Sequence, residues 1–161
     1  MKPASFISDS SSLILLAKAE LLGLLCQNAH LYITPAIRAE IIFDSPDSRV
    51  IRALIFTGEI AVRNPEDELR PSSLDLGEKT AISLFNCMRV DYLLIDDRKA
   101  ALYCRRHAIP YINALLVPCY LRGCGAMDGE TMREKIGVLT GIGRYAQWIK
   151  DYVSGVDHVF S

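Results

Sequence analysis

The chain has 161 residues, of which 50% are hydrophobic and 23% are charged, and its formal net charge is −1. This length suits one domain with a substantial core, and the composition excludes an intrinsically disordered chain. The near-zero net charge excludes a protein that attracts nucleic acid by its overall field. Any contact with phosphates therefore needs a local basic patch.

The cysteines and the N-terminus indicate the compartment. The five cysteines include no C-x-x-C pair and no zinc-ligand spacing, so we predict reduced thiols. Polar residues interrupt the N-terminal segment at Ser5 and Asp9, which argues against a signal peptide, and no apolar run is long enough to span a membrane. We expect a cytoplasmic protein without membrane contact.

Apolar runs and helical patterns alternate over the first 62 residues. Asp9 to Ser12 supply capping groups for one helix, and Thr34-Pro35 begin another. Residues 64–73 are polar and rich in acids and prolines, which predicts a loop. We predict strands at 4–8, 30–33 and 60–62, and helices at 13–26, from 35 onward, and at 50–56.

The alternation continues to residue 112 and then stops. We predict helices at 75–88 and 98–107 and strands at 92–95 and 110–112. This order favours an α/β fold with a parallel sheet covered by helices. Glycines after Leu121 form a break, followed by helical patterns at 130–139 and 145–153. We therefore expect one domain at 1–122 and a helical extension at 123–161 packed on it.

Five acidic residues occupy positions where carboxylates are uncommon. Asp9 and the pair Asp96-Asp97 follow predicted strands, and Glu40 and Glu78 lie among apolar residues of predicted helices. The carboxyl ends of parallel strands form the ligand-binding edge of such a sheet, and carboxylates are rarely buried unless they are paired or bind metal. Mg²⁺ or Mn²⁺ prefers these oxygen ligands and promotes phosphodiester hydrolysis. The pattern therefore predicts a metal-dependent phosphodiesterase.

Each acid alone also has a purely structural interpretation. Asp9 suits a helix cap, Glu40 an exposed position on an amphipathic helix, and Glu78 the first turn of a helix, where the helix dipole favours acids. Capping explains one carboxylate of Asp96-Asp97 but not both. The joint placement of the five acids, and no single one of them, favours the metal site.

Three motifs resemble those of the PIN-domain family: Asp9-Ser10-Ser11-Ser12-Leu13-Ile14, Leu76-Gly77-Glu78-Lys79-Thr80-Ala81-Ile82, and Leu93-Leu94-Ile95-Asp96-Asp97-Arg98-Lys99-Ala100. They are most similar to small prokaryotic PIN proteins, over about residues 5–122. The resemblance implies a three-layer α/β/α fold with a mainly parallel central sheet and Mg²⁺- or Mn²⁺-dependent ribonuclease activity. Two features depart from this branch: Ser12 stands where it often has proline, and residues after Leu121 match no motif.

The resemblance also implies roles for individual residues. The catalytic set is Asp9, Glu40, Glu78, Asp96 and Asp97. Asp9, Glu40 and Glu78 would bind the metal together with Asp97, which aligns better than Asp96, although the choice between these two stays open. Ser10 or Ser11 takes the position of a hydroxyl that steadies the first acid.

Basic residues gather on the predicted helix that follows the acid pair. At helical spacing, three arginines could share one face beside the acids, either as RNA contacts or as a solvated surface. Both interpretations stay open. With the two serines, the expected substrate-binding residues are Ser10, Ser11, Arg98, Lys99, Arg105 and Arg106.

Three functions are compatible with these patterns. The leading hypothesis is an endoribonuclease that acts as the toxin of a toxin–antitoxin pair, with RNA as substrate and a small antitoxin as partner. A homo-oligomer stays open. The alternatives are a non-catalytic PIN-like interaction module and, with less support, a Mg²⁺-dependent phosphoacceptor domain, which would need adjacent acids after its first strand.

Overall fold

The structure is a computed structural model that describes residues 2–67 and 73–155. Residues 68–72 of the predicted polar loop and residues 156–161 of the predicted extension lie outside the described residues. All five cysteines are free thiols, as predicted.

The described residues form a five-stranded parallel sheet in the order β3-β2-β1-β4-β5. The chain moves outward from β1 to β3 and then crosses over to β4 and β5. The direction of winding therefore reverses between β1 and β4, and ligands bind at such a switch point in open α/β sheets. The strands are β1 (Ala4–Ser8), β2 (Ala29–Ile33), β3 (Ile60–Val62), β4 (Tyr92–Leu94) and β5 (Tyr111–Ile112).

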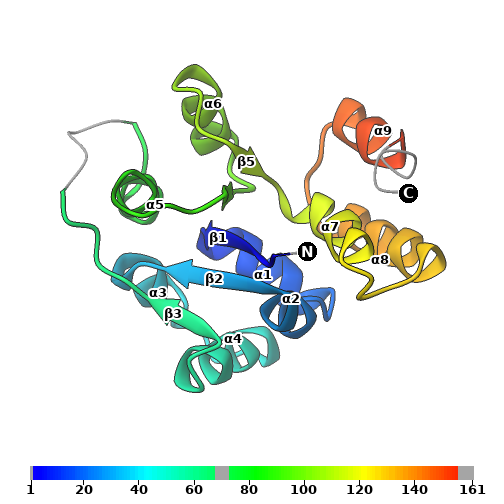
Figure 1. The fold of residues 1–161 in the computed structure, drawn as a ribbon, viewed down its shortest axis with the longest axis horizontal. Helices are drawn as coiled ribbons and strands as arrows, with labels where there is room; N and C mark the ends of the chain where they lie inside the picture. The colour runs from blue at the N-terminus through cyan, green and yellow to red at the C-terminus, as the bar shows by residue number, and fades with distance from the viewer. Residues whose placement is uncertain (1, 68–72, 156–161) are drawn as a thin grey trace.

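Helices cover both faces of this sheet, which confirms the predicted α/β/α architecture. Figure 1 shows α4 beside β3 at the bottom of the view, and α5 and α6 near β4 and β5 towards its top. The helices are α1 (Ser10–Lys18), α2 (Leu22–Asn28), α3 (Pro35–Glu40), α4 (Pro46–Phe56), α5 (Leu76–Cys87), α6 (Arg98–Arg106), the 3₁₀ helix η1 (Ala114–Leu116), α7 (Val117–Gly123), α8 (Gly129–Ile142) and α9 (Gln147–Gly155).

The prediction of one helix over 13–26 is wrong, because α1 and α2 are separate and meet at an angle of 109°. Glu20 adopts a left-handed backbone with φ 59°, and the Lys135 side chain of α8 donates a hydrogen bond to the Ala19 carbonyl at the end of α1. The bend lets Leu21 and Leu22 enter the core. Within the described residues, no single helix is long and apolar enough to cross a membrane; α1 and α2 meet the length and composition limits only as this bent pair.

Two further helices, α4 and α7, differ from the predictions. Helix α4 begins at Pro46 and not at residue 50, because Ser45 and Ser48 form a capping box that stabilises the first turn. Helix α7 was not predicted, since its apolar sequence carries Pro118, which is tolerated here in the first turn.

One hydrophobic core joins the sheet to the C-terminal helices. Phe6 and Ile7 of β1 lie at its centre, and Leu139 of α8 and Val153 of α9 belong to the same buried cluster. Helices α7 and α8 pack beside α1 and α2. Helix α8 therefore packs on α1, the helix that Asp9 caps.

Candidate metal and phosphodiester site

Asp9 lies at the switch point of the sheet. It follows β1 directly, and its backbone N–H donates to the Leu94 carbonyl of β4 at 3.0 Å. Its carboxylate accepts hydrogen bonds from the backbone N–H groups of Ser12, at 2.8 Å, and Asp96, at 3.2 Å. Asp9 is thus both the N-cap of α1 and a buried acid, with 4% of its surface exposed, at the expected edge.

Asp96 joins three separate segments of the chain. Its Oδ2 accepts hydrogen bonds from the Ser12 hydroxyl at 2.5 Å and the Ala114 backbone N–H at 3.0 Å. Its Oδ1 accepts a hydrogen bond from the Tyr145 hydroxyl at 2.7 Å. Protein donors therefore occupy both oxygens of Asp96, which fits an organising residue better than a metal ligand.

Asp97 and Glu78 form a second carboxyl pair. Asp97 caps α6, with its Oδ1 accepting from the backbone N–H groups of Lys99, at 2.8 Å, and Ala100, at 3.0 Å. Its carboxyl group also lies close enough to that of Glu78 for each to shift the pKa of the other. Glu78 is 7% exposed and forms a capping box with Asp75 at the start of α5. The two acids therefore connect the first turns of α5 and α6.

Glu40 reaches the same region from the end of α3. Its Oε2 accepts a hydrogen bond of 2.5 Å from the Ser10 hydroxyl. Its Oε1 lies so close to Gly77 that a Cβ at that position would collide with it. Gly77 therefore allows the Glu40 carboxylate to lie against the first turn of α5, next to Glu78, where the helix N-terminus favours negative charge.

The carboxyl groups differ in how the fold shifts their pKa values. Burial, with a contribution from the nearby Asp96 charge, raises the pKa of Asp9 to about 6. Burial and the contact with Asp97 raise the pKa of Glu78 to about 7. Burial also raises the pKa of Asp96, although its hydrogen bonds oppose this. Burial acts in the same direction on Asp97, but hydrogen bonds from Ala100, Glu78 and Lys99 lower its pKa overall.

These shifts bear on whether the acids suit a metal ion. In the described part of the chain, no three His, Cys, Asp or Glu side chains lie close enough together to ligate one ion as they stand. The acids instead form the pairs Asp9–Asp96 and Glu78–Asp97. Mg²⁺ often takes only one or two carboxylates and keeps several waters, so a two-carboxylate site with Asp9 and Glu40 nearby fits its chemistry.

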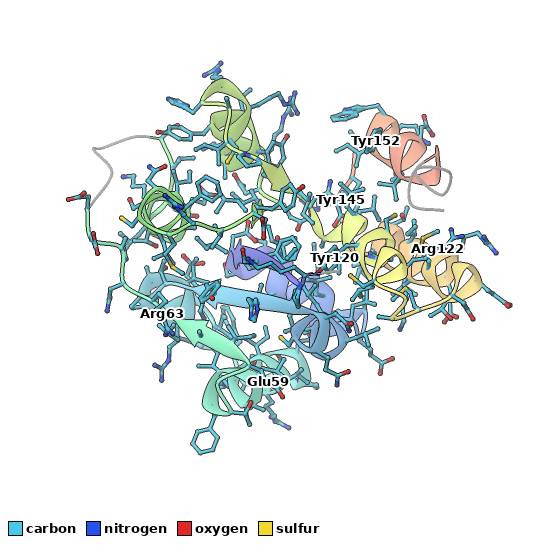
Figure 2. The ribbon with its side chains drawn as sticks, viewed as in Figure 1. Glu59, Arg63, Tyr120, Arg122, Tyr145 and Tyr152 are labelled. Carbon is cyan, nitrogen blue, oxygen red and sulfur yellow. The ribbon has the colours of Figure 1, made fainter. Side chains whose placement is uncertain are left out.

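A cavity of about 690 Å³ opens beside Asp96 and Asp97. Its other walls come from α1, from Ile142 at the end of α8, and from residues 143–145 in the connection between α8 and α9. Figure 2 labels Tyr145, which lies on this connection. The Tyr145 hydroxyl donates a hydrogen bond to Asp96. The cavity is large enough for a nucleotide-sized ligand.

The predicted substrate-binding residues divide into two groups. Ser11 and Arg98 line the cavity, and Ser10 contacts Glu40. Lys99 is exposed in the first turn of α6. The structure does not bring Arg105 and Arg106 to the acids, because they occupy the last turn of α6, about 11 Å along the helix from Arg98. Arg105 instead bonds to the Tyr111 hydroxyl and lies over the Trp148 ring.

Sequence reasoning missed three residues of this region. Ser12 was predicted to supply a helix-capping group and to depart from proline, but not to contact Asp96, which its hydroxyl binds. Asn113 follows β5 at the same sheet edge, and its buried Oδ1 has no hydrogen-bond partner among the described residues. Its position directly after a predicted strand could have placed Asn113 at this edge of the sheet from the sequence alone. Tyr145 had no such signal, because 49 residues separate it from Asp96.

The comparisons with known proteins agree with this geometry. A family model described as a PIN domain matches residues 5–147. The match extends beyond residue 122, where the sequence motifs predict its end, and so includes α7 and α8. No curated protein matches the chain. The chain belongs to the PIN-domain family and has a nuclease-type fold.

Proposed function

We propose that this protein is a Mg²⁺- or Mn²⁺-dependent endoribonuclease that hydrolyses RNA phosphodiesters. The main support is the meeting of acids from four separate segments at the carboxyl edge of the sheet: Asp9 after β1, Asp97 after β4, Glu40 on α3 and Glu78 on α5. PIN-domain proteins are generally nucleases, which supports a role for these acids in phosphodiester hydrolysis.

Asp97 and Glu78 would hold the metal, and Asp9 and Glu40 would lie nearby and become further ligands only after their side chains move. The ion would lower the pKa of a bound water and neutralise charge on the phosphate. Asp96 would keep the turn before Asp97 in place through its bonds to Ser12, Ala114 and Tyr145. In this assignment Asp97 binds metal and Asp96 organises the site.

The resemblance to small prokaryotic PIN proteins supports a biological role as the toxin of a toxin–antitoxin pair. A small antitoxin would then inhibit the protein by covering the acidic edge. The proposed RNA substrate is consistent with a cytoplasmic protein.

A non-catalytic interaction module is the second candidate. The observation in its favour is that Asp9 and Asp97 cap helices and Glu78 belongs to a capping box, so these acids have structural roles without any metal. Capping does not account for Glu40, which caps no helix and lies against Gly77.

RNA cleavage tests the proposal directly. The wild type should cleave single-stranded RNA in Mn²⁺ and not in EDTA, and Asp97→Asn should lower the rate at least about 100-fold. The matched control is Asp128→Asn, because Asp128 also caps a helix, α8, but lies outside the acidic site. Equal activity of Asp97→Asn and Asp128→Asn would contradict the assignment, and an inactive wild type would favour the interaction module.

A further inference from the structure

The cavity beside the acids differs from the acidic pairs because apolar side chains form part of its lining. This apolar part consists of Ile14 and Leu15 of α1 and Ile142 at the end of α8. Asp96 and Asp97 also line the cavity, so anything bound there lies next to Asp97, a proposed metal ligand. This combination suits a ligand that is partly apolar and that carries a reacting group at one end.

Two arginines line this cavity. Arg98 follows Asp97 directly, and Arg144 comes from the connection between α8 and α9. Both side chains are exposed, and within residues 2–67 and 73–155 no hydrogen bond or ion pair occupies them. Guanidinium groups recognise phosphate in a bidentate manner. The pair therefore suits a phosphate group at the cavity.

The fold holds the connection that carries Arg144 in place. The next residue, Tyr145, is half-buried and donates its hydroxyl hydrogen bond to Asp96. The Tyr145 ring also packs so closely on Gly143 that a Cβ there would collide with it. Arg144 thus lies between Gly143 and Tyr145. These two residues pack on each other, and Tyr145 is bonded to Asp96.

We propose that this cavity is an RNA subsite that binds the nucleotide next to the scissile phosphate, with Arg98 and Arg144 contacting phosphate and the apolar part of the lining receiving the base. The proposal rests on the proposed function and extends it to the α8–α9 connection, which lies outside the three PIN motifs. Tyr145 is the positioning residue of this subsite, because it acts through Asp96 and Arg144. Basic grooves with an apolar surface for bases are typical of single-strand binding.

Binding of a labelled RNA tests the subsite without any need for cleavage. The probe is a fluorescein-labelled single-stranded RNA of about ten nucleotides, titrated in EDTA and followed by anisotropy. Arg144→Ala should weaken binding about tenfold and reduce the salt dependence of log K by about 0.7. Arg144→Lys should keep that salt dependence. The control is Arg89→Ala, an exposed arginine that precedes β4 at the opposite sheet edge and should change neither quantity.

A glycine pair tests the positioning role of Tyr145. Gly143→Ala should weaken RNA binding several-fold by displacing the Tyr145 ring, but keep the salt dependence, because Arg144 retains its charge. Gly141→Ala in the last turn of α8, two residues before Gly143, is the matched control, since a Cβ at Gly141 meets nothing within 4 Å. Equal binding by these two variants would remove Tyr145 from the subsite.

The same preparations separate the subsite from the nuclease assignment. If the wild type binds RNA through Arg144 but never cleaves it in Mn²⁺, the subsite stands and the nuclease proposal falls. If the wild type cleaves RNA while Arg144→Ala binds as tightly and with the same salt dependence, the subsite falls, and an acidic protein segment becomes the better candidate for the cavity. A wild type that does not bind RNA overturns both.

Discussion

The two carboxyl pairs at the edge of the sheet differ in what compensates their charge. Around Asp9 and Asp96, backbone N–H groups and the hydroxyls of Ser12 and Tyr145 supply hydrogen bonds. Glu78 and Asp97 instead lie near each other, and Asp97 adds to burial in raising the pKa of Glu78. The first pair is thus adapted to organise the fold, and under the proposed function the second pair would exchange a proton for a metal ion.

The largest expected effect is on the pH dependence of stability without metal. The pKa of Asp9 rises from its ordinary value of 3.8 to about 6 in the fold, and that of Glu78 from 4.5 to about 7. Folding therefore favours their protonated forms, and the stability they contribute is present below about pH 4 and is lost as the pH rises towards 7. For Asp9 alone the loss is of the order of 3 kcal/mol.

Urea unfolding in EDTA at pH 4 and pH 8 measures most of this difference. Asp9→Asn should reduce it, because asparagine keeps the helix cap but does not titrate. Mn²⁺ should also reduce it, by replacing the proton near Glu78. A pH dependence that is the same in Asp9→Asn and in the wild type would show that Asp9 ionises normally.

The next effect concerns the organising role of Asp96. Asp96→Asn places an amide where three donors converge, and we expect it to lower the free energy of unfolding by about 2 kcal/mol. Asp97→Asn should cost less, since asparagine still caps α6. Urea unfolding of both variants at neutral pH compares them. A more severe loss for Asp97→Asn would reverse the roles assigned to the two residues.

The smallest effect concerns the position of Glu40. Gly77→Ala should push the Glu40 carboxylate away from Glu78 and weaken Mn²⁺ binding about tenfold, as other changes around metal ligands do. Gly23→Ala is the control, because a Cβ at Gly23 in α2 meets nothing within 4 Å. Calorimetric titration gives both affinities. Unchanged binding by Gly77→Ala would exclude Glu40 from the ligand set.

Local sequence signals were enough to predict the sheet and the positions of most of the acids. The strands that end before Asp9 and Asp96 are short apolar runs followed by capping residues, and both properties depend on neighbouring residues only. The parallel direction of the strands then followed from their alternation with helices. Gly77 was part of a predicted motif, although its purpose, making space for Glu40, appears only in three dimensions.

Features that depend on distant contacts could not be predicted. The bend at Glu20 occurs in an apolar stretch without glycine or proline and is accompanied by a bond from Lys135 to the end of α1. The distinction between Asp96 and Asp97 depends on Tyr145, which lies in a segment that no motif connected to the acids. Adjacent residues of the same type carry no local signal that separates their roles.

Isothermal titration of Mn²⁺ into the wild type, Asp97→Asn and Asp96→Asn tests the central claim most directly. The account predicts that the wild type binds Mn²⁺ with release of protons near neutral pH, because Glu78 must lose its proton. Asp97→Asn should lose this binding, whereas Asp96→Asn should keep it as long as it stays folded. No binding by the wild type, or binding that survives in Asp97→Asn but is lost in folded Asp96→Asn, would contradict the account.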